Sequence, residues 1–246
     1  MKLNSDIAAM LDFRPASNAP TNYSIKDWPA EQRPREKLLK HGVQSLNDAE
    51  LLAVFLRTGI AGRNALTLGT DLLQRFGNLH GIVNATKEDF CKSKGLGLAK
   101  WANLAAAAEI TRRSLQNELQ ERSAFRSPAM VKDYLCLWFS NRPFEAFVAL
   151  FLDAQHRLID SKELFRGTVN QTAVYPREVV KVALEMNAAA VVVSHNHPSG
   201  SLEPSNSDHL LTKGIKEALS TVDIRLLDHL IVGGNKTLSF AEKGLL

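Results

Sequence analysis

The hydrophobic pattern of this chain changes near Pro128, and this change limits the fold more than any other feature of the sequence. Before it, apolar residues recur at helical spacing and no segment alternates like a strand. After it, apolar runs of strand length are separated by helical patterns. Strands that intermingle with helices are typical of a mixed sheet covered by helices. The pattern predicts an all-helical N-terminal domain followed by an α/β (α+β) domain.

The predicted domains divide the chain at the polar stretch before Pro128. Residues 1–24 lack periodicity and are interpreted as a mobile tail. Residues 25–120 form the helical domain, 121–127 the linker and 128–246 the mixed-sheet domain. Helices are expected over 33–41, 46–56 (capped by Asn47 or Ser45), 64–76, 79–84, 87–91, 98–119, 130–139, 176–187 and 205–220. Strands are expected over 145–153, 156–164, 188–195, 224–232 and 237–240.

Composition favours an ordinary globular protein. An apolar fraction of 45% and a charged fraction of 23% are typical of that class. No apolar run approaches the roughly 20 residues that span a bilayer, so no membrane association is expected. The N-terminus has no apolar core of the signal-peptide kind. Cys91 and Cys136 form neither a disulfide framework nor a metal pair, which favours a cytoplasmic location.

Positive charge is concentrated in the first half. Residues 1–127 contain 18 Lys and Arg against 13 Asp and Glu, whereas residues 128–246 contain 12 against 13. A basic surface hints at an anionic partner, although solvated surface charge explains such an excess more often.

The segment from Ser194 to Asp208 carries a metal-binding pattern. His195 and His197 follow an apolar run that reads as a buried strand. Residues i and i+2 of a strand point to the same side, so both imidazoles can aim at one point. A helix that begins near Ser205 would bring Asp208 to that point in its first turn. Two His and one carboxylate leave the fourth position of a zinc ion open for water, which is the catalytic arrangement.

A zinc-dependent hydrolase also needs a carboxylate that is not a metal ligand. Such a group accepts the proton of the attacking water and passes it to the leaving amine. The upstream candidates are Asp160, Glu163, Glu178 and Glu185. Glu163 ends a predicted strand that could lie beside the metal strand, but the residues alone leave the choice open.

The motif resembles that of the JAMM/MPN metalloproteases, in particular the RadC-type (UPF0758) branch. The similarity covers most of residues 25–246 and is carried by Glu163-Leu-Phe-Arg-Gly-Thr, His195-Asn-His-Pro-Ser-Gly, Glu203-Pro-Ser and Leu227-Asp-His. It implies a JAMM/MPN-like fold for the C-terminal domain. It also implies one Zn²⁺ per chain, bound by His195, His197 and Asp208. Glu163 would activate the zinc-bound water, and Ser205 would stabilise the oxyanion.

Simpler interpretations stand beside these roles. Ser205 is also a good helix N-cap with Asp208 three residues later, and capping competes for the same hydroxyl. His229 is interpreted as structural rather than as a supporting group of the site. His209 should point away from the metal, since neighbouring helix residues do not share a face. A cytidine-deaminase site is excluded, because it requires His-x-Glu followed by Pro-Cys-x-x-Cys.

A second motif lies in the helical domain. Lys94, Gly95, Gly97 and Lys100 form a Gly-x-Gly turn with flanking lysines at the start of a predicted helix. This turn resembles a helix-hairpin-helix, an element of RadC-type proteins that contacts nucleic-acid backbone through main-chain amides. It predicts weak non-specific DNA binding, with structural packing as the simpler interpretation.

These observations favour a zinc metallopeptidase that cleaves a peptide or isopeptide bond in a peptide or protein substrate. On this hypothesis Glu163→Gln abolishes activity while zinc stays bound. Two alternatives remain: a DNA-associated accessory protein of repair or recombination, and a zinc-dependent nuclease. DNA affinity that persists in residues 1–127 would favour the first of these, and chelator-sensitive nicking of DNA the second.

Overall fold

The structure is a computed structural model that describes residues 24–123, 128–167 and 174–246. The predicted tail lies outside the described residues up to position 23, and so do residues 124–127 of the predicted linker. The chain forms two compact units: residues up to Leu79 with Ser93–Gly95, and His80–Lys92 with Leu96–Leu246. This division differs from the domains predicted from the sequence, because the long helix α6 (Leu98–Glu121) packs on α7 and β2 of the sheet unit.

The first unit is helical, as predicted. It contains α1 (Pro34–His41), α2 (Asp48–Leu56) and α3 (Ala65–Phe76). Asn47 is the N-cap of α2, where it forms a capping box with Glu50. Helices α2 and α3 approach closely at Gly69, where a Cβ atom would lie 2.8 Å from the Ala49 carbonyl oxygen. The buried side chains between them are leucines and small residues, so this unit has an apolar core of its own.

The second unit is built around one mixed sheet. Its helices are α4 (Leu79–Val83), α5 (Lys87–Cys91), α6, α7 (Pro128–Trp138), α8 (Pro176–Glu185) and α9 (Asn206–Ser220). Its strands are β1 (Ala146–Leu152), β2 (Leu158–Arg166), β3 (Ala190–Asn196), β4 (Arg225–Gly233) and β5 (Lys236–Ser239). The strand order is β2-β1-β3-β4-β5, and only the β3–β4 pair is parallel. The predicted fold class is confirmed.

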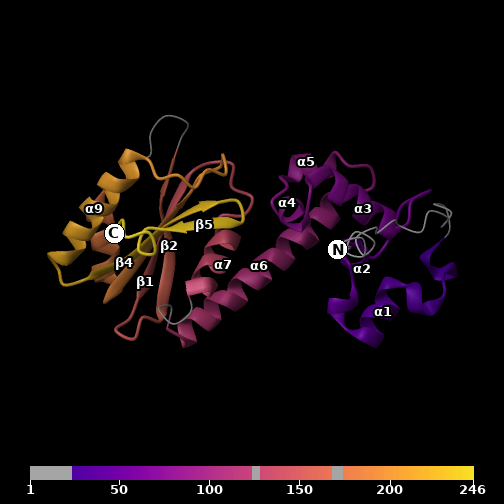
Figure 1. Cartoon of the computed structure of the whole chain (residues 1–246), viewed down its shortest axis with the longest axis horizontal. Coiled ribbons are helices and arrows are strands. Elements are labelled where there is room, and N and C mark those ends of the chain that lie inside the picture. The colour runs from indigo at the N-terminus through magenta and orange to yellow at the C-terminus, as the bar shows by residue number, and fades with distance from the viewer. Residues whose placement is uncertain (1–23, 124–127, 168–173) are drawn as a thin grey trace, which may run out of the picture. The chain divides into compact units, whose positions relative to one another are not determined.

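Helices cover both faces of this sheet (Figure 1). On one face, Leu119 of α6 and Tyr134 of α7 pack on Val148 and Leu150. On the other, helices α8 and α9 pack on the alternate residues of β1, including Phe147. Strand β1 is therefore buried on both faces, which explains why its apolar run is uninterrupted.

Among the helices that the structure describes, none has both the length and the apolar character needed to cross a lipid bilayer.

Candidate metal centre

The two predicted histidine ligands lie at the end of β3. His195 is on the strand, and His197 follows it with its N–H donated to the Val232 carbonyl at 2.8 Å, which extends the pairing with β4. Their Nε2 atoms lie 3.0 Å apart. The strand alternation predicted from the sequence therefore brings both imidazoles to one point.

Asp208 reaches the same point from the first turn of α9. Its Oδ1 lies 3.2 Å from Nε2 of His195, and its Oδ2 lies 4.0 Å from Nε2 of His197. Burial raises the pKa of Asp208, but the charge that His195 carries when it is protonated and the hydrogen bonds from Ser205 outweigh this effect, so the net shift of the Asp208 pKa is downward. Within the described parts of the chain, this is the one group of three or more such side chains close enough to share a metal ion.

A chain of hydrogen bonds determines which nitrogen of His195 carries the proton. Thr212 donates its hydroxyl hydrogen to the Asp208 carbonyl at 2.6 Å, so its oxygen accepts the N–H of His229 Nδ1, also at 2.6 Å. Burial lowers the pKa of His229 to about 3, so this histidine is neutral and its Nε2 is an acceptor. His195 therefore donates from Nδ1 to His229 Nε2 over 2.8 Å. The Nε2 atom of His195 is left with a bare lone pair.

The same reasoning applies to His197. Its Nδ1 lies 3.0 Å from the Ser201 carbonyl, which can only accept, so neutral His197 also has a lone pair on Nε2. Two lone pairs that face each other at 3.0 Å, with the Asp208 carboxylate beside them, repel unless a cation lies between them. Ligand atoms around a tetrahedral zinc lie roughly 3.3 Å apart. The donor set and its spacing fit zinc.

Ser205 caps α9 and also contacts Asp208 of the candidate metal site. Its Oγ accepts the N–H of Asp208 at 3.2 Å and donates to Asp208 Oδ2 at 2.7 Å. Capping uses an oxygen lone pair, whereas oxyanion binding would use the hydroxyl hydrogen. The two roles weighed from the sequence are therefore compatible.

The structure does not bring Glu163 to the candidate metal site. Val148 of β1 pairs with Glu163 on one side and with Ser194 on the other, whereas Phe147 pairs with Phe165 and His195. Residues directly opposite one another across strands share a face. Glu163 therefore lies on the α6–α7 face, and His195 lies on the α8–α9 face. This corrects the expectation that Glu163 sits at the metal.

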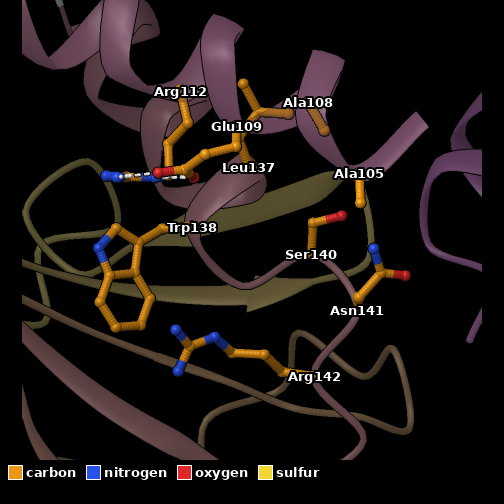
Figure 2. A pocket seen from close by; sticks show the side chains of 9 residues that line it. All are labelled: Ala105, Ala108, Glu109, Arg112, Leu137, Trp138, Ser140, Asn141 and Arg142. Atoms are coloured by element: carbon orange, nitrogen blue, oxygen red, sulfur yellow. Dashed lines mark hydrogen bonds and ion pairs between the residues drawn. The ribbon is translucent and has the colours of Figure 1, made fainter. Parts of the chain in front are cut away.

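The Glu163 carboxylate is instead held by two guanidinium groups. It pairs with Arg142 through Oε2 and with Arg166 through Oε1 at 2.8 Å. Arg142 also stacks on the Trp138 ring, 3.9 Å from its centroid, beside a pocket of about 340 Å³ (Figure 2). Burial raises the pKa of Glu163, but the hydrogen bonds from the two arginines lower it by a larger amount. The net shift of the pKa is therefore downward. A carboxylate held in this way is a weak proton acceptor.

A different carboxylate lies on the metal face, by which we mean the α8–α9 face of the sheet that carries the two histidines. Glu145 precedes β1 by one residue, and Phe147, two positions later, pairs with His195. Continuing this register places Glu145 opposite His197 and on the face of both histidines. The hydrogen bond from Ala146 N to the Asn196 side chain, 2.8 Å, confirms that the two strand ends lie side by side. Glu145 is exposed and forms no ion pair with any described residue.

Sequence reasoning missed Glu145, although it had placed this residue at the start of a buried strand. The signal available was an acidic residue directly before an apolar strand. Only the pairing of β1 with β3 connects that residue to the metal site.

Comparison with known proteins identifies the family. The UPF0758 N-terminal model matches residues 25–102, and the RadC-like JAB domain model matches residues 125–245. UPF0758 proteins from Janthinobacterium sp. (strain Marseille), Herminiimonas arsenicoxydans and Nitrosospira multiformis are each 55% identical over 223 residues. These residues cover 91% of this chain and 100% of each relative. The chain belongs to the UPF0758 family.

Membership of the UPF0758 family confirms the resemblance described from the sequence. A RadC-like JAB domain is consistent with a JAMM/MPN-type hydrolase fold. The names of the three relatives state the family and no activity.

A pocket of about 220 Å³ adjoins the candidate metal site and includes His197 in its wall. Its wall includes His80 and Asn84 from the α4–α5 segment and Asn141 and Arg142 from the α7–β1 connection. Asn141 is held by a hydrogen bond from its N–H to Asn84 Oδ1, 3.1 Å, while its own Oδ1 is buried without a partner among the described residues. The α4–α5 segment of this UPF0758 protein therefore forms part of the surroundings of the candidate metal site.

The Gly-x-Gly turn of the UPF0758 N-terminal region has a packing role in the structure. Gly95 has a φ of +87°, and a Cβ atom there would lie 2.7 Å from Ile60 Cγ2, so only glycine fits. Gly97 precedes α6 without a side-chain cap. Burial lowers the pKa of Lys100, and Lys94 is exposed. DNA binding through these residues stays a prediction.

Proposed function

We propose that this UPF0758 protein is a zinc-dependent hydrolase of peptide or isopeptide bonds. The observation that carries the proposal is the convergence of two imidazole lone pairs and a carboxylate, from His195, His197 and Asp208, on one point. A cytoplasmic location remains our prediction from the cysteine content.

The three residues would hold one zinc ion per chain. Zinc bound by three protein groups supplies Lewis-acid polarisation and makes water a nucleophile near neutral pH. The Thr212–His229 pair would keep the proton of His195 on Nδ1, away from the metal.

We assign the proton acceptor to Glu145 rather than to Glu163. Glu145 lies on the metal face with its carboxylate unpaired among the described residues, so it can take a proton from water and deliver it to the leaving amine. Ser205 can turn its hydroxyl hydrogen from Asp208 towards the oxygen of the scissile carbonyl, while its oxygen continues to cap α9. The pocket beside His197 would receive the substrate residue next to the scissile bond.

The first experiment is the metal content of the full chain by plasma mass spectrometry, with His197→Ala beside the wild type. We expect about one zinc per wild-type chain and its loss in the variant. No zinc in the wild-type protein, even after zinc is supplied, would contradict the proposal. Zinc-loaded protein is then screened against peptide and isopeptide-linked substrates, with nicking of DNA as the readout for the nuclease alternative.

A further inference from the structure

A basic cavity lies in the helical unit, where the chain passes from α2 to α3. Its volume is about 530 Å³, and its wall is formed by residues 57–65 together with residues 24–26. Cavities that bind small molecules measure roughly 300–1,000 Å³. The lining residues include Lys26, Arg57 and Arg63, and none of them is acidic. The lining therefore favours an anion.

Two of the three cations are not neutralised within the described chain. Arg63 pairs with Asp71 at 2.6 Å. The side chains of Lys26 and Arg57 form no ion pair with any residue that the structure describes. This contrasts with Glu163 in the sheet unit, where two arginines are paired with one carboxylate. Unpaired cations around one cavity raise the local positive potential.

The backbone at Arg57 is strained in a way that glycine would relieve. Arg57 has φ 64° and ψ −48°, and the hydrogen bond from Thr58 N to Leu56 O, 2.7 Å, closes a three-residue γ-turn around it. Turns of this kind are rare and unfavourable for residues with a side chain. An arginine in this conformation costs stability, and strained residues of this kind are concentrated at functional sites.

The same cavity reaches the beginning of α3. Asn64 caps this helix by accepting the N–H of Thr67 at 2.9 Å, and the first N–H groups of the helix have no partner within it. The partial positive charge of a helix N-terminus adds to that of the basic side chains.

We propose that this cavity, lined by Lys26, Arg57 and Arg63 at the start of α3, binds a phosphate group. The phosphate belongs either to the backbone of a nucleic acid or to a small phosphorylated molecule. The cavity adjoins the Gly-x-Gly turn, because Gly95 packs on Ile60 of its wall, but no residue of that turn lines it. The site does not depend on the proposed zinc chemistry.

The test uses the full chain, a fluorescein-labelled DNA duplex read by anisotropy, and inorganic pyrophosphate read by calorimetry. Lys26→Gln and Arg57→Gln should each weaken binding about 5- to 10-fold and reduce the salt dependence of duplex binding by about one ion. The matched control is Arg35→Gln, which removes the same charge from an exposed position on α1 outside the cavity.

A further variant separates binding from folding. Arg57→Gly removes the charge and relieves the turn, so it should bind as weakly as Arg57→Gln but unfold at no lower temperature than the wild type. A lower unfolding temperature together with unchanged binding would show that Arg57 is structural and overturn the proposal.

The two probes distinguish the sources of the phosphate. Duplex binding that falls in Lys26→Gln and Arg57→Gln but not in Arg35→Gln supports a nucleic-acid ligand. Pyrophosphate binding with the same dependence, and no duplex binding, supports a small phosphorylated ligand. Binding of neither probe, or an equal loss in all three variants, overturns the proposal.

Discussion

The two faces of the sheet both carry clusters of charged side chains, yet their chemistry differs. On the α8–α9 face, His195, His197 and Asp208 direct two lone pairs and a carboxylate at one point. On the α6–α7 face, Glu163 is neutralised by Arg142 and Arg166. The first arrangement is electrostatically unfavourable until a cation binds, and the second is complete without a ligand.

The difference teaches that the pairing of a charged group, rather than its presence, marks a functional site. Glu163 has the residue type and the sequence position expected of a catalytic base, but both of its oxygens are engaged. Glu145 has a less conspicuous position in the sequence, and its carboxylate is available on the metal face.

The largest effect on turnover is expected from replacing Glu145, and Glu163 is replaced in the same way as a control. Glu145→Gln should lower turnover of a cleaved substrate about 100- to 10,000-fold, because it removes the proton acceptor and leaves the zinc ligands intact. Turnover and zinc content are measured on the same preparation. Reduced turnover with a full complement of zinc is the expected result.

The matched control is Glu163→Gln on the opposite face. It should leave turnover close to that of the wild type and lower the unfolding temperature, because Arg142 and Arg166 lose their counter-charge. If Glu163→Gln abolishes turnover while Glu145→Gln does not, the contrast between the two faces is wrong.

The stability of the metal-free protein should depend on pH differently for the two faces. Burial lowers the pKa of His195 to about 4 and that of His229 to about 3, from an ordinary value of 6.5. Below that ordinary value the unfolded chain takes up protons that the folded chain does not. Each histidine therefore contributes stability that is complete above pH 6.5 and is lost as pH falls towards 4, at about 1.4 kcal/mol per pH unit.

The Glu163 cluster responds at lower pH. Its net pKa shift is downward, so its contribution to stability is complete above the ordinary glutamate value of 4.5 and is lost only below it. Urea unfolding of the metal-free chain between pH 7.5 and pH 5 should therefore report the buried histidines rather than the Glu163 cluster, with His80 contributing beside His195 and His229 because burial lowers its pKa as well. His229→Gln should flatten this dependence, and an unchanged slope would contradict the assignment.

A smaller effect is expected at Thr212. Thr212→Val removes the acceptor for the N–H of His229 Nδ1, which allows the proton of His229 to move to Nε2. His195 must then accept on Nδ1 and carry its own proton on Nε2, the atom proposed to bind zinc. Zinc affinity should fall about 10- to 100-fold, measured by competition with a chromophoric chelator.

Thr212→Ser keeps the hydroxyl and provides the rescue for this experiment. It should bind zinc with nearly wild-type affinity, since the hydrogen bonds to His229 and to the Asp208 carbonyl can both be remade. Equal affinity in Thr212→Val and Thr212→Ser would show that the hydroxyl has no role in positioning His195.

Most of the elements could be predicted from local pattern. The helix expected over 64–76 is observed as Ala65–Phe76, and the helix expected over 205–220 as Asn206–Ser220. The capping side chains Asn64 and Ser205 define where these helices begin, and Gly77 ends the first of them. Such signals act within a few residues, so they can be read from the sequence alone.

The shared direction of His195 and His197 could be predicted for the same reason. The contact of His229 with His195 could not. His195 and His197 share a face because of the two-residue period of a strand. The sequence favours a structural role for His229, whereas in the structure it holds His195 through a hydrogen bond between adjacent strands. No spacing within one segment shows which residue of a neighbouring strand comes into contact.

The sequence by itself determined the order of the elements, the common direction of the two imidazoles and the position of Asp208 in a capped first turn, because each depends on neighbours along the chain. Tertiary structure decided which carboxylate joins them. The register of β1, with an irregularity between Phe147 and Val148, turns Glu163 to one face and Glu145 to the other. Strand register is set by packing between distant segments, and a shift of one residue reverses every side chain.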